Sequence, residues 1–306
     1  MNKRPIIIDT DPGIDDAVAL AIALFSEELD VKLLTTVAGN VGVDKVTYNT
    51  LRLLKYFNKE VPVAIGANEP LIRPAVDASN VHGASGMEGF DFEEPTYDLV
   101  LEENAVNAMY RVIMENDTPI TLVPIGPLTN IALLFKVYPE VKEKISEIVL
   151  MGGSASRGNM GVMSEFNMHV DPEAAKIVFN SGVPIVMAGL DVGLKALVFP
   201  EDSAQIKEMN NVGKMIYSLF QKYRGGSMKT GLKMYDSTAI AYLLKPEMFE
   251  AIDTYVDIEL NGEMTAGCTV VDLKGYYKKP SNAKVCMDID QDMFRNWLLD
   301  SLRRCN

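Results

Sequence analysis

The chain has 306 residues, of which 48% are hydrophobic and 23% are charged, a composition with enough apolar side chains for one large core. The formal net charge of −13 at pH 7 disfavours binding to phosphate backbones and anionic membranes, and favours a neutral substrate or a bound cation. No apolar stretch reaches the roughly 18 residues of a membrane-spanning helix, and no linker or repeat divides residues 1–306, so we expect a single domain.

Short apolar strands alternate with amphipathic helices along the chain. Residues 5–9 are the first expected strand, and a turn at Pro12 and Gly13 leads into a helix that begins at Asp15. Further strands are expected at residues 31–37, 61–65, 120–125, 148–151 and 185–188, and a helix at residues 44–56. This pattern predicts an α/β fold with a mainly parallel central sheet flanked by helices. In such sheets ligands bind outside the carboxyl ends of the strands.

Four aspartates, Asp9, Asp11, Asp15 and Asp16, lie within eight residues at the end of the first predicted strand. One of them could cap the next helix, but a cap needs one acid and leaves the others unexplained. Converging carboxylates repel one another, and a hard divalent cation is the usual remedy. Because no cysteine or histidine lies nearby, the sequence predicts an all-oxygen site for Ca²⁺ or Mg²⁺.

Residues 9–17 (DTDPGIDDA) resemble the signature of the inosine-uridine-preferring nucleoside hydrolase family. Further matching segments follow in the family's order at residues 37–40 (VAGN), 81–86 (VHGASG), 125–130 (IGPLTN), 151–153 (MGG), 165–167 (EFN), 171–175 (DPEAA), 189–191 (GLD) and 269–272 (TVVD). The chain most resembles the bacterial ribonucleoside hydrolases of broad specificity. The resemblance implies the nucleoside hydrolase fold with its Rossmann-like core, and hydrolysis of purine or pyrimidine ribonucleosides to free base and ribose.

The same resemblance implies roles for individual residues. A Ca²⁺ site is implied at Asp11, Asp16, the main-chain carbonyl of Ile125 and Asp236, with Asp9 in support, and Asp11 would also be the general base for the attacking water. Substrate contacts are implied for Asp15, Asn40, Asn159, Glu165 and Asn167, with Met151 packing nearby. The glycine-rich run at residues 152–161 lacks the spacing of a phosphate-binding loop, and we interpret it as an active-site loop that delivers Asn159.

Tyr235 departs from the pattern of many relatives, which carry a histidine at this position to protonate the departing base. A tyrosine has an ordinary pKa of about 10 and is a weaker acid than imidazolium. We therefore expect altered activation of the leaving group, with slower cleavage of purines that depend on ring protonation. The alternative is a nucleoside-binding protein that has weakened or lost catalysis.

Two other residues each allow two interpretations. His82 lies in the VHGASG segment and is either catalytic or a residue that orders the loop. Tyr223 either contacts the nucleobase or is a surface aromatic of an amphipathic helix, and Gly225-Gly226 after it would suit the hinge of a lid.

A phosphohydrolase of the haloacid-dehalogenase type is the alternative enzyme class, because it also begins with an Asp-x-Asp motif. That motif has threonine or valine where this chain has Gly13, and it leaves Asp15 and Asp16 unexplained.

The expected partners are a small ribonucleoside and further copies of this chain, as a dimer or tetramer, with no nucleic acid and no membrane. The apolar run Ile6–Ile8 is too short for a secretory signal. The three cysteines are odd in number, widely spaced and without a CxxC motif, which disfavours disulfides and zinc. A cytoplasmic location is therefore expected.

Overall fold

Side chains that alternate along the central strands build two apolar layers, one on each face of a sheet. The computed structural model describes residues 3–306. In β1 (Arg4–Thr10), Ile6 and Ile8 pack into one core and Ile7 into the other. Successive side chains of a strand point to opposite faces, so a fully apolar strand is stable only when both faces are covered.

The central sheet has the strand order β10-β13-β6-β5-β4-β1-β2-β3 within residues 3–306. Its other strands are β2 (Leu29–Thr36), β3 (Val63–Ile65), β4 (Ile120–Pro124), β5 (Ile145–Met151), β6 (Ile185–Ala188), β10 (Phe249–Thr254) and β13 (Ala283–Ile289). Neighbouring strands are parallel except at one edge, where β10 runs antiparallel to β13. The predicted strands from residue 5 to residue 188 are therefore present, and β13 and β10 extend the sheet beyond them.

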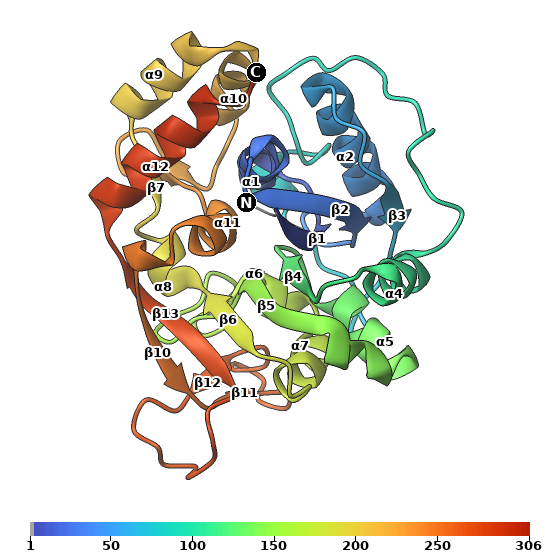
Figure 1. Ribbon diagram of the computed structural model, residues 1–306. Coiled ribbons are helices and arrows are strands. Elements are labelled where there is room, and N and C mark those ends of the chain that lie inside the picture. Colours follow the sequence, from blue (N-terminus) through green and yellow to red (C-terminus); the bar gives the residue numbers. More distant parts are fainter. Residues whose placement is uncertain (1–2) are drawn as a thin grey trace.

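Helices cover both faces of this sheet (Figure 1). One core is closed by α1 (Ile14–Phe25), α2 (Val43–Phe57), α9 (Pro200–Met209), α10 (Asn211–Phe220), α11 (Ser237–Leu244) and α12 (Gln291–Arg303). The other core is closed by α4 (Ala105–Glu115), α5 (Thr129–Val137) and α7 (Pro172–Phe179), which lie at the lower right of the view. These two layers confirm the predicted α/β fold class.

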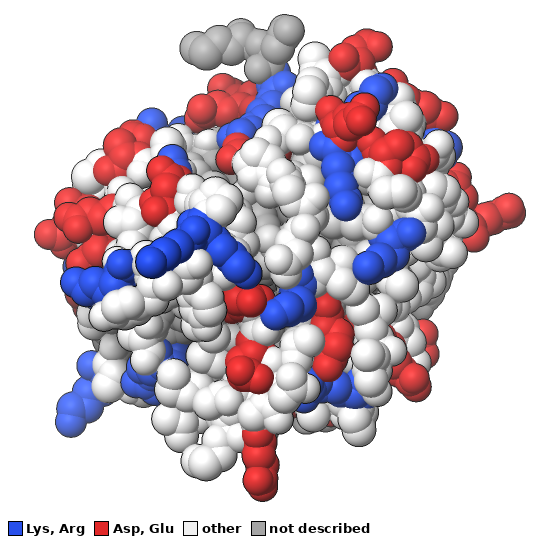
Figure 2. Space-filling model, turned by 90° about the horizontal axis from the view of Figure 1, so that it is seen from below, with Lys and Arg blue, Asp and Glu red and all other residues white. Residues whose placement is uncertain are grey.

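Shorter elements surround this frame. They are the helices α3 (Ser79–His82), α6 (Phe166–Val170) and α8 (Leu190–Gly193), the 3₁₀ turns η1 (Pro139–Lys144) and η2 (Pro246–Met248), the paired strands β11 (Val256–Ile258) and β12 (Thr269–Val271), and the small sheet of β7 (Leu197–Val198), β9 (Gly231–Lys233) and β8 (Gly226–Ser227). Among the described helices, none combines the length and apolar character needed to cross a bilayer. Acidic and basic side chains are interspersed on the face seen in Figure 2.

Candidate active site

A cavity of about 250 Å³ opens at the carboxyl ends of the parallel strands. Asp11 follows β1, Ile125 follows β4 and Met151 ends β5, and all three line it. Every predicted site residue except Asp9 and Asp16 lines this one cavity: Asp11, Asp15, Asn40, His82, Ile125, Met151, Asn159, Glu165, Asn167, Tyr223, Tyr235 and Asp236. The general rule for parallel sheets therefore accounts for Asp11, Ile125 and Met151, while the other residues come from helices and loops.

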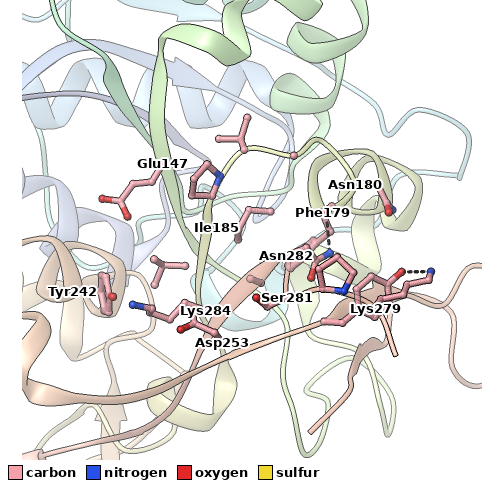
Figure 3. Close-up of a pocket in the computed structure, with 17 residues that line it drawn as sticks. Glu147, Phe179, Asn180, Ile185, Tyr242, Asp253, Lys279, Ser281, Asn282 and Lys284 are labelled. Atoms are coloured by element: carbon pink, nitrogen blue, oxygen red, sulfur yellow. Dashed lines mark hydrogen bonds between the residues drawn. The ribbon is translucent and has the colours of Figure 1, made fainter. Parts of the chain in front are cut away.

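A larger cavity of about 730 Å³ lies at the opposite end of the strands, where β6 and β13 begin with Ile185 and Ala283 (Figure 3). Several of its polar side chains already have partners. Asn282 donates to the carbonyls of Phe179 and Val256, and the Lys279 ammonium donates to the Tyr255 hydroxyl at 2.7 Å. Size alone thus does not identify the active site, and the smaller cavity holds the chemistry.

The floor of the smaller cavity is a cluster of buried carboxylates. Asp15, Asp16 and Asp236 each offer an oxygen within 4.8 Å of the others. Asp16 accepts hydrogen bonds from the Thr10 hydroxyl at 2.8 Å and from the Gly13 amide at 2.9 Å, so it also caps α1. Asp236 stands at the N-cap of α11 without using its side chain to cap it. The cluster therefore contains more carboxylates than capping requires.

Asn40 ties Asp11 to this cluster. Its amide nitrogen donates to the Asp11 carboxylate at 2.7 Å, and its side-chain amide donates to the Asp11 carbonyl at 3.0 Å and to Asp16 at 3.2 Å. Gly39, just before it, has no room for a side chain, because a Cβ would overlap the Asp11 carboxylate. The turn after β2 thus fixes the orientation of the Asp11 carboxylate.

Burial raises the pKa values of these acids. Burial, reinforced by the charge of Asp16, raises the pKa of Asp15 to about 7 and that of Asp11 well above its usual range. The pKa of Asp236 is raised by burial and by the charges of Asp15, Asp16 and Asp11. Carboxylates that crowd together in this way bind a cation favourably, because the cation removes both the repulsion and part of the desolvation cost.

Asp9 lies beneath the cluster and is held by side chains from two other elements. Its Oδ1 accepts hydrogen bonds from the Thr35 hydroxyl at 2.6 Å and from the Asn130 amide at 2.8 Å. Its Oδ2 is buried and has no hydrogen-bond partner among the described residues, and burial raises its pKa to about 7. The orientation of Asp9 is therefore set by Thr35 and Asn130.

The opposite wall of the cavity carries Glu165 and Asn167. The Glu165 carboxylate accepts from the amides of Gly153 at 2.9 Å and Asn167 at 3.0 Å, and burial raises its pKa to about 7. The Asn167 side chain donates to the carbonyls of Ile125 at 2.9 Å and Met151 at 3.0 Å. Asn159 is exposed at the tip of the preceding loop. These contacts connect the wall directly to the ends of β4 and β5.

His82 and two tyrosines close the cavity. The Nδ1 atom of His82 accepts a hydrogen bond from the Ile14 amide at 3.1 Å, and burial lowers the pKa of the ring to about 4. The ring centroid of Tyr223 is 5.5 Å from that of His82, and its hydroxyl donates to the Lys233 carbonyl at 3.0 Å. Burial and the charge of Asp15 raise the pKa of Tyr235 above its ordinary value. All three side chains are therefore uncharged at neutral pH.

Comparison with known proteins identifies the family. The family model described as inosine-uridine preferring nucleoside hydrolase matches residues 6–296. The chain belongs to this family. It is 53% identical over 295 residues to the non-specific ribonucleoside hydrolase RihC of Klebsiella pneumoniae, which covers 96% of this chain and 97% of the relative. RihC of Salmonella typhi is 52% identical over 295 residues, 96% of each chain.

A solved structure agrees with these relatives. The purine-preferring ribonucleoside hydrolase from Gardnerella vaginalis is 27% identical, superposes with a TM-score of 0.91 and covers 99% of both chains. The predicted resemblance, the fold class and the assignment as a nucleoside hydrolase are thus confirmed, and a binding protein without catalysis is not favoured.

The cavity of this nucleoside hydrolase also contains residues that the sequence did not single out. Asp77, Asn80, Arg224 and Lys233 line its mouth. The Arg224 guanidinium donates to the Asn80 carbonyl at 3.1 Å, which joins the segment after α10 to α3. These residues lie outside the recognised motifs, and only the fold brings residues 77–80 next to residues 224–233.

Proposed function

We propose that this nucleoside hydrolase cleaves the N-glycosidic bond of both purine and pyrimidine ribonucleosides, giving free base and ribose. The observation that carries the proposal is the cluster of buried carboxylates at the floor of a cavity whose walls offer amide and carboxylate groups. Such a surface suits a neutral polyhydroxylated sugar on which positive charge develops. The broad base specificity is supported by the name of the two RihC relatives, which are described as non-specific.

We propose Ca²⁺ as the cofactor, held by Asp11, Asp16, Asp236 and the carbonyl of Ile125. The donor set fits a hard cation, because every group is an oxygen. No lysine or arginine within residues 3–306 forms an ion pair with these three aspartates, so their charge is not balanced by a side chain. When bound, the ion would offset this charge and increase the acidity of adjacent water.

Asp11 is the proposed general base. The Asn40 backbone amide holds the orientation of the Asp11 carboxylate, which can accept a proton from water. The water oxygen forms a bond to C1′ while the bond from C1′ to the base nitrogen breaks, and the base leaves with the electron pair. Positive charge builds on C1′ and O4′ during this step, and the surrounding carboxylates stabilise it.

The remaining residues position the sugar. Asp15 and Asn40 are proposed to bind ribose hydroxyls beside the cation. Glu165, Asn167 and Asn159 are proposed to bind the 5′ side, with Met151 packing nearby. Polar contacts along the whole sugar explain how one site accepts different bases, because recognition does not depend on the base.

Departure of the base is assigned to weak, uncharged acids. Tyr235 takes the place of the histidine found in many relatives, and its raised pKa keeps its proton at neutral pH. His82 is proposed to serve both the catalytic site and the order of its loop, since its Nδ1 accepts from the backbone and leaves Nε2–H free to donate. Tyr223 is proposed to contact the base. Purines that require ring protonation are therefore expected to react more slowly.

We also propose one domain over residues 1–306, a homo-oligomer (dimer or tetramer) and a cytoplasmic location. One central sheet contains strands from the beginning of the chain (β1) and from near its end (β13), which supports a single domain. The cysteines Cys268, Cys286 and Cys305, which are buried free thiols, support a reducing compartment.

The test is release of ribose from a panel of ribonucleosides by protein supplied with Ca²⁺. Asp11→Asn preserves the shape of the side chain and should lower kcat about 10²- to 10⁴-fold. Asp202→Asn is the matched control, because Asp202 is equally buried but pairs with Arg295, away from the cavity. Absence of ribose from every nucleoside with the unaltered protein, or full activity of Asp11→Asn, would contradict the proposal.

A further inference from the structure

The loop between β5 and α6 carries Asn159 at its tip and Glu165 at its end. The first residues of the loop form hydrogen bonds to several other segments. The Gly153 amide donates to Glu165 at 2.9 Å, and the Gly153 carbonyl accepts from the Leu190 amide at 2.9 Å. Gly153 has a φ of +75°, which favours glycine. The base of the loop is thus fixed, while its tip is exposed.

Thr269 of β12 holds the next residue of the loop. Its hydroxyl accepts from the Ser154 amide at 2.8 Å and donates to the Ser154 carbonyl at 2.5 Å. Both side chains are buried, at 4% exposure each. A Cβ on Gly153 would come within 2.8 Å of the Thr269 methyl, and a Cβ on Gly267 would overlap Ser164 at the other end of the loop. Residues 267–269 therefore contact both ends of the loop.

Asp191 of α8 holds the following two residues. Its Oδ2 accepts from the Ala155 amide at 2.7 Å, and its Oδ1 accepts from the Ser156 hydroxyl at 2.6 Å. Beyond them, the loop depends on its own backbone, where the amide of Asn159 donates to the Ser164 carbonyl at 3.0 Å. The position of Asn159 is thus set by a short hairpin whose base is anchored by Thr269 and Asp191.

We propose that Thr269 and Asp191 are positioning residues for recognition of the 5′ hydroxyl of the ribose. Neither side chain lines the cavity, so both act through the loop that presents Asn159 and Glu165. The inference rests on the proposed function, because it assumes that these two residues bind the 5′ side of the sugar. Loosening the anchors should weaken this contact selectively and leave the carboxylate cluster in place.

The test compares uridine with 5′-deoxyuridine, which lacks the hydroxyl in question, by measuring release of uracil. Thr269→Val keeps the shape of threonine and leaves both buried groups of Ser154 unpaired. It should lower kcat/KM for uridine about tenfold or more and for 5′-deoxyuridine less than about threefold. Thr269→Ser keeps the hydroxyl and should restore uridine hydrolysis. Asp191→Asn loses one of the two accepted bonds and should show the same selectivity to a smaller extent.

Thr254→Val is the matched control. Thr254 is also buried and donates to the carbonyl of Asp272 at 2.8 Å, but it does not contact the loop. It should change neither substrate by more than about twofold. Equal losses on both substrates in Thr269→Val, or no loss on either, would overturn the positioning role, and Asp191→Asn decides if Thr269→Val does not fold. Failure of the unaltered protein to cleave uridine would instead overturn the proposed function.

Discussion

Chelation of divalent cations is expected to lower the thermal midpoint of unfolding, and to lower it more at pH 8 than at pH 5. Burial raises the pKa of Asp9 to about 7, whereas the group titrates near 3.8 when exposed. The pKa of Asp9 is higher in the folded state than in the unfolded state. Its contribution to the free energy of unfolding is therefore fully present below pH 4 and is lost as the pH rises through 7. For this single carboxyl group the loss corresponds to about 4 kcal/mol.

A cation that binds the ionised carboxylates of Asp11, Asp16 and Asp236 offsets this loss. At a concentration about 1,000 times its Kd it contributes about 4 kcal/mol to the free energy of unfolding. For a chain of this size, that corresponds to a rise of roughly 6 °C in the thermal midpoint. The difference between calcium-loaded and chelated protein should therefore grow from pH 5 to pH 8, because the carboxylates must lose their protons to bind the ion.

The assay is thermal unfolding followed by circular dichroism, with Ca²⁺ or with EDTA, at several pH values. Asp236→Asn removes one charge of the cluster and should abolish most of the calcium-dependent rise. Asp202→Asn, whose carboxylate pairs with Arg295, should lower stability but keep the response to calcium. The reasoning fails if the midpoints with Ca²⁺ and with EDTA coincide at pH 8, or if Asp236→Asn responds as strongly as the unaltered protein.

Three further predictions concern activity. Gly39→Ala should lower kcat about 100-fold or more, because the added methyl group displaces the Asp11 carboxylate. Gly42→Ala is the control and should retain full activity, because its added methyl group meets no atom within 4 Å. Equal kcat values of the two variants in steady-state assays would contradict this. Tyr235→His should raise the ratio of inosine to uridine turnover, most strongly below pH 7, and an unchanged ratio would remove the special role of this tyrosine. Burial lowers the pKa of His82 to about 4, so its imidazole stays neutral above pH 5. His82→Gln should therefore leave the shape of the pH profile of kcat/KM unchanged between pH 5.5 and 8. A change of slope near pH 6.5 that disappears in the variant would refute this.

The early strands and the acidic loop could be predicted from the sequence because their signals are local. The apolar run at residues 6–8 and the four aspartates after it lie in one short segment, and parallel strands place their carboxyl ends at one edge. Asp11, Ile125 and Met151 therefore converge as expected. β13 escaped prediction because its sequence, AKVCMDI, mixes polar and apolar residues, as suits a strand near the sheet edge.

The distal half of the site could not be found by local reasoning. Asp236 and Tyr223 follow long stretches of helix and turn. The hydrophobic periodicity of the sequence does not show that the N-terminus of α11 lies near the end of β1. The resemblance to the family supplied these positions. Asn130 belonged to a recognised motif, but its bond to Asp9 depends on how α5 packs under the sheet. Thr269 gave no signal beyond its motif, because its partner is the backbone of a distant loop.

The strand order also governs when the site can form. β1 lies inside the sheet, between β2 and β4, and β13 pairs with β6 only after most of the chain has been made. Such long-range pairing is characteristic of slow folding. Asp11 lies near the start of the chain and Asp236 far downstream, so a nascent chain on the ribosome lacks part of the proposed cation site. Under the proposed mechanism, a growing chain cleaves no nucleoside until α11 has emerged and docked.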